Sequence, residues 1–377
     1  MNRISRYKFD IWLIIPMIIM FFISIISILS AEKLLGINNL AIKQIIWYVI
    51  GFIFIFIIMH FGNRYLFNNI KYLYIIGIIL LIGLFFFGSE INNAKCWYSL
   101  GSLGTFQPSE FVKIILILVL AIMIDDFNNR YNNPSTSCEL IFLLKIMLVV
   151  LIPSILTFLQ PDTGIVLIYL LITIIMLFIG GIRYRWFIIL FSVLALILGF
   201  ILLTYFFNQD LFINIFGTDF FLRIDRLLDW SNGSGYQLSN GMSAIGSGGF
   251  LGNGLFKTPI YFPEAQTDFI FAVYASNFGY IGSIFLILVI LFFDFKLIEL
   301  ANKCKSNLNK YIIAGFIGML TYQQFQNIGM TIGIMPITGI TLPFISYGGS
   351  SLLSYLIMFG IILNISNECI KNKKNVY

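Results

Sequence analysis

The stretch that decides the fold covers residues 164–207 and reads GIVLIYLLITIIMLFIGGIRYRWFIILFSVLALILGFILLTYFF. Two apolar runs, 164–182 and 186–207, are separated by a short segment that carries Arg183 and Arg185. A bilayer core about 30 Å thick needs roughly 20 apolar residues per helical span, so each run predicts one membrane-spanning helix. The two arginines predict that the connection between these helices lies in the cytoplasm.

Similar runs occur along the whole chain. They cover residues 11–30, 44–60, 72–88, 111–124, 141–159, 164–182, 186–207, 269–293, 311–333 and 350–366. The 377 residues are 59% hydrophobic and only 11% charged, with a mean hydropathy of +0.94. A soluble domain carries about a quarter charged residues. The sequence therefore predicts an all-α polytopic membrane protein with about ten transmembrane helices, forming a single membrane domain over residues 1–377.

The distribution of basic residues predicts the orientation of the chain. With the N-terminus inside, sixteen of the 23 Lys and Arg residues fall in cytoplasmic segments and seven in outer segments. Both termini are therefore expected in the cytoplasm, and the chain in the cytoplasmic membrane. The net charge of +6 reflects this bias, so it does not indicate nucleic-acid binding. Cys138, Cys304 and Cys369 fall on the inner side and only Cys96 on the outer side, where a single cysteine cannot form an intramolecular disulfide.

Two outer loops are longer than simple connections. They cover residues 88–110 and, between the seventh and eighth helices, residues 208–268. Within the second loop, residues 220–230 have the pattern of a helix, lying either in the membrane interface or on a solvated surface. The glycine-rich residues 246–254 lack the preceding strand that a nucleotide-binding loop requires, so these glycines are expected to permit tight turns.

Charged residues collect at the outer ends of the predicted helices, where a charge is costly to place. Glu110 and Lys113 are three residues apart and able to pair. Asp162 is able either to cap the following helix or to contact a ligand, and Asp268 either caps a helix or acts chemically. A charged outer site among apolar helices suits a lipid with a large polar head group, and basic residues there suit a phosphate or diphosphate.

Five motifs make the chain similar to the SEDS family of cell-wall polymerases, which includes RodA, FtsW and SpoVE. They are QPSEFVK at 107–113, QPDTG at 160–164, AIGSGG at 244–249, PEAQTDFIFAV at 263–273, and the segment 327–350, which ends in SYGGS. The resemblance extends over nearly the whole chain. The run NIGMTIG at 327–333 looks most like RodA, the elongation member of the family.

The resemblance implies a peptidoglycan glycosyltransferase that polymerises lipid II at the outer face of the membrane, for cell elongation and shape or for division. The family's essential aspartate falls on Asp268, which is expected to be the general base on the acceptor sugar hydroxyl. Diphosphate is a good leaving group, so one base plus a positive charge that stabilises the diphosphate suffices. That positive charge would come from Lys113, Arg223 or Arg226, or from a divalent cation (Mg²⁺ or Mn²⁺). The remaining predicted substrate-binding residues are Glu110, Lys95, Trp97, Asp162, Glu264, Thr267, Ser346, Tyr347 and Ser350.

The chain departs from the family pattern at two places. The family often has an arginine where this chain has Cys96, and Lys95 is the nearest replacement. An acidic pair commonly found after the aspartate motif is replaced by Ser276 and Asn277. Both changes leave the motif around Asp268 intact.

Two other function classes fit the composition. A flippase or transporter for lipid-linked precursors would use the same charged pocket, but it would need an inward-facing polar route that the outer motifs do not provide. A non-catalytic scaffold would leave the clustering of Glu110, Lys113 and Asp268 unexplained. Family members usually work with a class B penicillin-binding protein, and this chain contains no crosslinking domain, so the resemblance implies such a partner.

Overall fold

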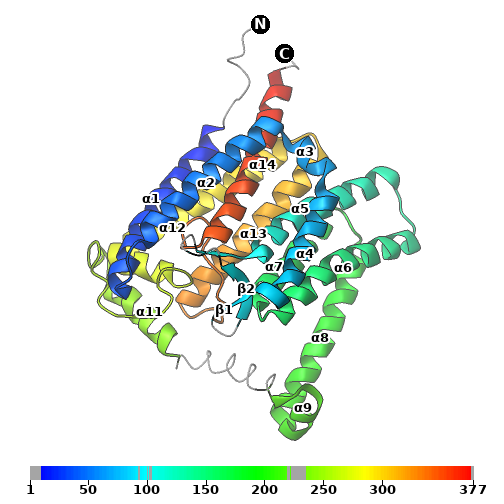
Figure 1. The fold of residues 1–377 in the computed structure, drawn as a ribbon. Helices are drawn as coiled ribbons and strands as arrows, with labels where there is room; N and C mark the ends of the chain where they lie inside the picture. The colour runs from blue at the N-terminus through cyan, green and yellow to red at the C-terminus, as the bar shows by residue number, and fades with distance from the viewer. Residues whose placement is uncertain are drawn as a thin grey trace.

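The computed structural model describes residues 10–91, 94–99, 101, 104–218, 221 and 235–374. Across these residues the chain forms a helical bundle with one small sheet (Figure 1). The helices are α1 (Ile11–Leu35), α2 (Leu40–Phe61), α3 (Asn63–Asn68), α4 (Ile70–Phe87), α5 (Pro108–Arg130), α6 (Thr136–Leu159), α7 (Thr163–Ile179), α8 (Tyr184–Phe207), α9 (Gln209–Phe216), α11 (Tyr236–Ser247), α12 (Ile270–Lys303), α13 (Asn307–Thr331) and α14 (Gly349–Lys374).

Every apolar run singled out in the sequence is helical. Within the described residues, seven helices are long and apolar enough to cross a bilayer: α1, α2, α4, α6, α8, α12 and α14. The other three expected spans correspond to α7, which is shorter, and to α5 and α13, which carry buried charged or amide side chains. The predicted polytopic all-helical class is confirmed.

Several helix ends are set by residues visible in the sequence. Asp10 caps α1 by accepting a hydrogen bond from the Trp12 backbone N–H, and Gly36 ends that helix in the left-handed conformation (φ 68°). Ser135 and Ser306 cap α6 and α13 in the same way as Asp10. These caps satisfy backbone groups that a helix end otherwise leaves without partners.

The two ends of the bundle differ, as the charge pattern predicts. The start of α1 and the end of α14 lie at one end, while the sheet, α9 and α11 lie at the other (Figure 1). Residues 131–135 and 180–183, which join α5 to α6 and α7 to α8, are cytoplasmic by the predicted orientation, and the two long loops are outer. The chain is a multi-pass protein of the cytoplasmic membrane, and the cytoplasmic position of both termini stays a prediction from the charge pattern.

The first outer loop contains a small antiparallel sheet that the sequence analysis did not predict. Its order is β1 (Ser89–Ile91), β2 (Ala94–Ser99) and β3 (Thr105–Phe106). Ser89 pairs with Trp97, and Tyr98 pairs with Phe106, whose rings stack 6.4 Å apart. β1 and β3, with three and two residues, are too short for a recognisable alternation of polar and apolar side chains.

The second outer loop wraps around a bend in α12. Gly279 has φ 65° and ψ −160°, so α12 consists of a segment up to residue 278 and a longer segment after it. The glycine-rich loop packs on this bend: the backbone N–H of Gly254 donates to Asn277, and that of Tyr280 donates to Gly249. The expectation that these glycines permit tight turns is confirmed, and the span predicted at 269–293 is interrupted near its start.

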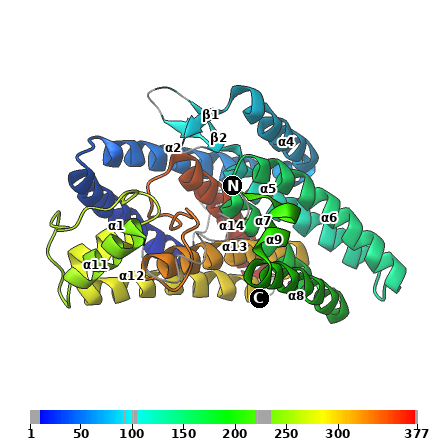
Figure 2. The ribbon, with the colours of Figure 1, turned by 90° about the horizontal axis from the view of Figure 1, so that it is seen from below.

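The bundle has a buried centre and a loosely attached edge. α14 lies in the middle, with α2, α5 and α13 around it (Figure 2). α8 stands apart in Figure 1, and of its residues only Thr204 and Tyr205 are buried. Its contacts are mainly with α9.

Candidate active site

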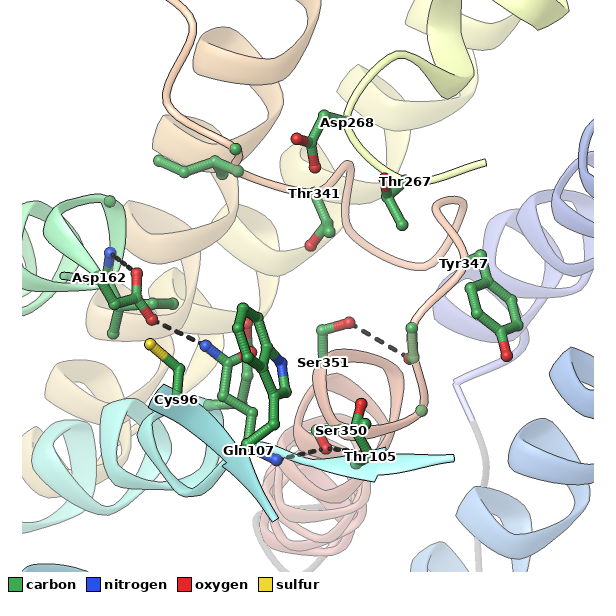
Figure 3. Close-up of a pocket in the computed structure, with 18 of the residues that line it drawn as sticks. Cys96, Thr105, Gln107, Asp162, Thr267, Asp268, Thr341, Tyr347, Ser350 and Ser351 are labelled. Carbon is green, nitrogen blue, oxygen red and sulfur yellow. Dashed lines mark hydrogen bonds between the residues drawn. The ribbon is translucent and has the colours of Figure 1, made fainter. Parts of the chain in front are cut away.

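A cavity of about 550 Å³ opens at the outer end of the bundle. Six segments of the chain enclose it: the β2–β3 region, the starts of α5 and α7, the loop before α12, residues 338–341 and the start of α14 (Figure 3). Eight residues predicted for the site line it: Trp97, Glu110, Asp162, Glu264, Thr267, Asp268, Tyr347 and Ser350. The fold thus brings most of the predicted set together.

Asn327 of α13 holds two walls of this cavity. Its side-chain amide donates to the backbone oxygens of Asp268 and Ile340, both at 2.8 Å. Ser346 adds a further connection, because its hydroxyl donates to the backbone oxygen of Thr267 at 2.6 Å. Ser346 is buried and does not line the cavity, so it shapes the loop instead of facing a ligand.

Helices α1 and α2 support the loop before α14 from behind. The Ser24 hydroxyl donates to the backbone oxygen of Ile345 at 2.8 Å, and the Gln44 amide donates to that of Ser346 at 3.1 Å. The Tyr48 hydroxyl donates to the backbone oxygen of Phe344. Since Phe344, Ile345 and Ser346 are buried, the three donors satisfy carbonyl groups that would otherwise cost free energy.

The Asp268 carboxylate faces the cavity opposite residues 339–341 (Figure 3). Burial raises its pKa to about 7, the negative charge of Glu264 adds to this, and the Thr267 side chain partly opposes it. Thr267 also donates its hydroxyl to Glu264 at 2.7 Å, which fixes the two acids relative to each other. The opposite wall is close at Gly339 (φ 71°), since a Cβ built there would be in van der Waals contact with the Asp268 Oδ2 atom at 3.6 Å.

Asp162 both caps a helix and lines the cavity. Its carboxylate accepts hydrogen bonds from the Ile165 backbone N–H at 3.2 Å and from the Gln107 side chain at 2.7 Å (Figure 3). Burial raises the pKa of Asp162 to about 6, while these two donors act in the opposite direction. The capping interpretation is confirmed, and the position of Asp162 in the wall leaves the ligand-contact interpretation open as a prediction.

Glu110 and Lys113 form a buried ion pair at the base of the cavity. Lys113 is 0% exposed, and its ammonium lies 4.3 Å from the centre of the Tyr355 ring. Glu110 lines the cavity but Lys113 does not. The predicted pairing of the two is present, and the charge of Lys113 lies behind the wall instead of in direct reach of a ligand.

The strand β2 decides which way the neighbouring side chains of Lys95 and Cys96 face. Cys96 is 2% exposed and lines the cavity, and its thiol donates to the backbone oxygen of Gln160 at 2.7 Å. Lys95 is exposed and does not line the cavity. Because side chains alternate across a strand, Lys95 cannot take the place of a residue at position 96. Burial raises the pKa of the Cys96 thiol to about 12, and the negative charge of Asp162 adds to this shift.

Some predicted positions lie elsewhere, and some lining residues were missed. Arg223 and Arg226 lie outside the described residues, as does the helix expected over residues 220–230 apart from residue 221. Gln107 and Gln323 line the cavity, although neither was predicted as a site residue. Gln323 is an amide inside a predicted apolar span, which is a signal that could have identified it.

The charge of the described cavity wall is negative. Four carboxylates line it (Glu110, Asp162, Glu264 and Asp268), and no Lys or Arg is among its described lining residues. Where the chain is described, no group of three or more His, Cys, Asp or Glu side chains could hold a metal ion. A magnesium ion usually takes only one or two protein carboxylates together with substrate phosphates, so the divalent cation predicted as a stabiliser stays a prediction, and no chemical step is assigned to one.

Comparisons with known proteins identify the family of the chain. A family model for FtsW, RodA and SpoVE, described as "Cell cycle protein", matches residues 5–371. "Probable peptidoglycan glycosyltransferase FtsW" of Wigglesworthia glossinidia brevipalpis is 33% identical, covering 99% of this chain and 97% of that protein. The Lactococcus lactis protein of the same name is 30% identical over 94% of this chain and 92% of its own length.

Solved structures share the fold. A chain from "Structural coordination of polymerization and crosslinking by a peptidoglycan synthase complex" aligns with a TM-score of 0.79 and 26% identity, covering 96% of this chain and 98% of that one. The crystal structure of the rod shape determining protein RodA of Thermus thermophilus gives a TM-score of 0.69 at 26% identity, covering 96% and 97%. The chain therefore belongs to the FtsW, RodA and SpoVE family, the SEDS family that its motifs resemble.

Proposed function

We propose that the protein is a peptidoglycan glycosyltransferase that polymerises lipid II into glycan strands at the outer face of the cytoplasmic membrane. The observation that carries the proposal is a carboxylate, Asp268, with a pKa raised to about 7, facing an outer cavity in a chain of this family. We further propose that residues 1–377 act as one membrane domain, because the cavity draws on segments from β2 to α14.

The proposed reaction transfers a glycosyl group between two lipid-linked substrates. The acceptor hydroxyl oxygen attacks the anomeric carbon of the donor and forms the new glycosidic bond, while the bond from that carbon to the lipid diphosphate breaks. Asp268 takes the proton of the attacking hydroxyl. A base with a pKa near the working pH is efficient in this role, because it is largely deprotonated yet still basic.

The other residues are assigned supporting roles. Glu264 and Thr267 position Asp268 through the contact between them. Trp97 and Tyr347 offer aromatic faces to sugar rings, and Ser350 holds the β3–α5 connection by accepting from the Gln107 backbone N–H at 2.9 Å. Lys113 compensates Glu110 from behind the wall, and contacts of Arg223 and Arg226 with the diphosphate stay predictions from the sequence.

The test is polymerisation of fluorescent lipid II by the purified protein, with and without a class B penicillin-binding protein. Asp268→Asn should lose polymer formation by at least 100-fold, the lower end of the range for a general base, while still binding lipid II. Asp210→Asn, a change at an exposed outer carboxylate on α9, should leave activity unchanged.

The outcomes separate the competing functions. Equal polymer from wild type and Asp268→Asn would refute the assignment of the base. If the wild type makes no polymer even with the partner, lipid II translocation in proteoliposomes becomes the relevant assay. Directional transport there would favour the flippase.

A transpeptidase partner and the cellular role belong to the same proposal. The solved complex of polymerisation and crosslinking supports a class B penicillin-binding protein as the partner. The FtsW relatives support a role in division, while the RodA structure and the residues 327–333 support one in elongation. Copurification with the division or with the elongation transpeptidase distinguishes the two, and the RodA assignment stays a prediction.

A further inference from the structure

Two cysteines meet at the cytoplasmic end of the bundle, far from the cavity. Cys304 follows the last residue of α12, and Cys369 lies near the end of α14. Their Sγ atoms are 2.7 Å apart although the residues are separated by 65 positions. Cys304 is 4% exposed, whereas Cys369 is half-buried and reachable from solvent.

We infer that Cys304 and Cys369 form a reversible disulfide bond that joins α12 to α14 when a disulfide oxidant reaches the cytoplasmic face. The inference is independent of the proposed glycosyltransferase activity. Two sulfurs bond only when the backbone already places them close together with facing side chains, and this pair meets that condition. The sulfurs are already in contact, so the bond needs only a small further approach of the two side chains.

A shared metal ion explains the pair less well. Two thiolates bound to a tetrahedral zinc ion at about 2.3 Å each are separated by about 3.8 Å, which is longer than the observed contact. No cluster of three or more His, Cys, Asp or Glu residues able to hold a metal occurs in the described part of the chain, so a zinc ion here would have two protein ligands only. The geometry therefore favours a sulfur–sulfur bond.

The chemistry is thiol–disulfide exchange with a small disulfide such as oxidised glutathione. The Cys369 thiolate attacks one sulfur of the oxidant, which forms a mixed disulfide and releases one thiolate. The Cys304 thiolate then attacks the Cys369 sulfur, forms the internal bond and releases the second thiolate. Two protein thiols become one disulfide, one oxidant is reduced to two thiols, and the two protons lost by the cysteines pass to the released thiolates.

The surroundings of the pair keep it reduced at rest. Contact with Cys369 and burial raise the pKa of Cys304, and the nearby Lys310 opposes part of this shift while Glu368 adds to it. Cys304 is thus mostly protonated at neutral pH, and the more exposed Cys369 reacts first. In the cytoplasm, where thiols are normally reduced, a bond of this kind is transient and responds to oxidation.

The bond would connect helices that reach both sides of the cavity. α12 begins two residues after Asp268, and α14 begins at Gly349, which lines the cavity beside Ser350. The disulfide joins the C-terminal ends of these two helices, which lie far from the cavity. It therefore restricts their movement relative to each other without touching the cavity itself.

The test uses the full-length protein in detergent, treated with oxidised glutathione and then alkylated with a maleimide under denaturing conditions. Mass spectrometry should show two of the four cysteines protected and a peptide that links Cys304 to Cys369. Cys138→Ser, a change at the third cytoplasmic cysteine, should retain the linked peptide. Cys304→Ser should lose it and keep a glutathione adduct on Cys369.

A thermal measurement gives a second readout. Oxidation should raise the midpoint of thermal unfolding of the wild type, and a reductant should reverse the rise; Cys304→Ser should show neither change. Glutathione adducts on both Cys304 and Cys369 without a linked peptide would overturn the inference, as would full alkylation of all four cysteines. Because the wild type alone decides the mass measurement, a variant that fails to fold does not obscure it.

Discussion

The raised pKa of Asp268 has an electrostatic cause that can be altered one residue at a time. Burial is the larger contribution and the charge of Glu264 the next. Removing that neighbouring charge takes away part of what disfavours the ionised form of Asp268, and the pKa of Asp268 falls. A base with a lower pKa is ionised at more acidic pH.

The first prediction is a pH profile. For the wild type, kcat/KM for lipid II polymerisation should rise with pH through about 7, as Asp268 loses its proton. In Glu264→Gln this acidic limb should move to lower pH, because the folded protein no longer holds a second carboxylate beside Asp268. Asp210→Asn, at the exposed carboxylate on α9, should leave the limb in place. An unchanged limb in Glu264→Gln would show that the two carboxylates are not coupled.

At the scale of elements, the ion pair of α5 is buried against α14. Glu110 and Lys113 are both largely removed from solvent, with Tyr355 over the ammonium and the Ser354 hydroxyl 3.5 Å from the carboxylate. A buried ion pair is costly to break, because the remaining charge has no partner, but it is often replaceable as a unit.

The second prediction follows from this asymmetry. Glu110→Gln and Lys113→Met should each lower the free energy of unfolding by about 3–5 kcal/mol, and the double variant should recover most of the loss. Thermal unfolding in detergent measures the effect. Additive losses in the double variant would mean that the two charges are not coupled in the folded protein.

The bend in α12 makes a third prediction possible. An alanine Cβ at Gly279 would lie 2.4 Å from the Gly252 backbone nitrogen, and the φ of 65° with ψ −160° is a region open almost only to glycine. Gly279→Ala should therefore destabilise the protein by about 3 kcal/mol or more. Gly246→Ala meets nothing within 4 Å and should change stability by less than about 0.5 kcal/mol. Equal melting temperatures for the two variants would rule out a role for the bend.

For the whole molecule, the orientation in the membrane is open to direct measurement. Lys95 is exposed on the outer sheet, and Cys138 lies at the cytoplasmic start of α6. In a background without native cysteines, a membrane-impermeant maleimide should label Lys95→Cys in intact spheroplasts. A variant that keeps Cys138 alone should be labelled only after permeabilisation. Labelling of Cys138 in intact cells would invert the topology.

The features of this fold that can be predicted from the sequence are those that the membrane itself imposes, namely the helical spans and their orientation. A segment in lipid must satisfy its own backbone hydrogen bonds, so each long apolar run becomes a helix, and the Lys and Arg distribution orients the bundle. The gathering of Asp162, Glu264 and Asp268 follows from their motifs. That the Lys95 side chain points away from the cavity could not be predicted, because it depends on the strand β2. That Lys113 is buried behind the cavity wall could not be predicted either, because it depends on how α5 packs against α14.

The loose attachment of α8 has an evolutionary consequence. Only Thr204 and Tyr205 of this helix are buried, so nearly all its side chains meet lipid. Lipid chains solvate all apolar side chains about equally well. Selection therefore acts on the length and hydrophobicity of α8 and hardly on the identity of its residues. Across species its sequence should drift freely, while α14, enclosed in the bundle, changes slowly.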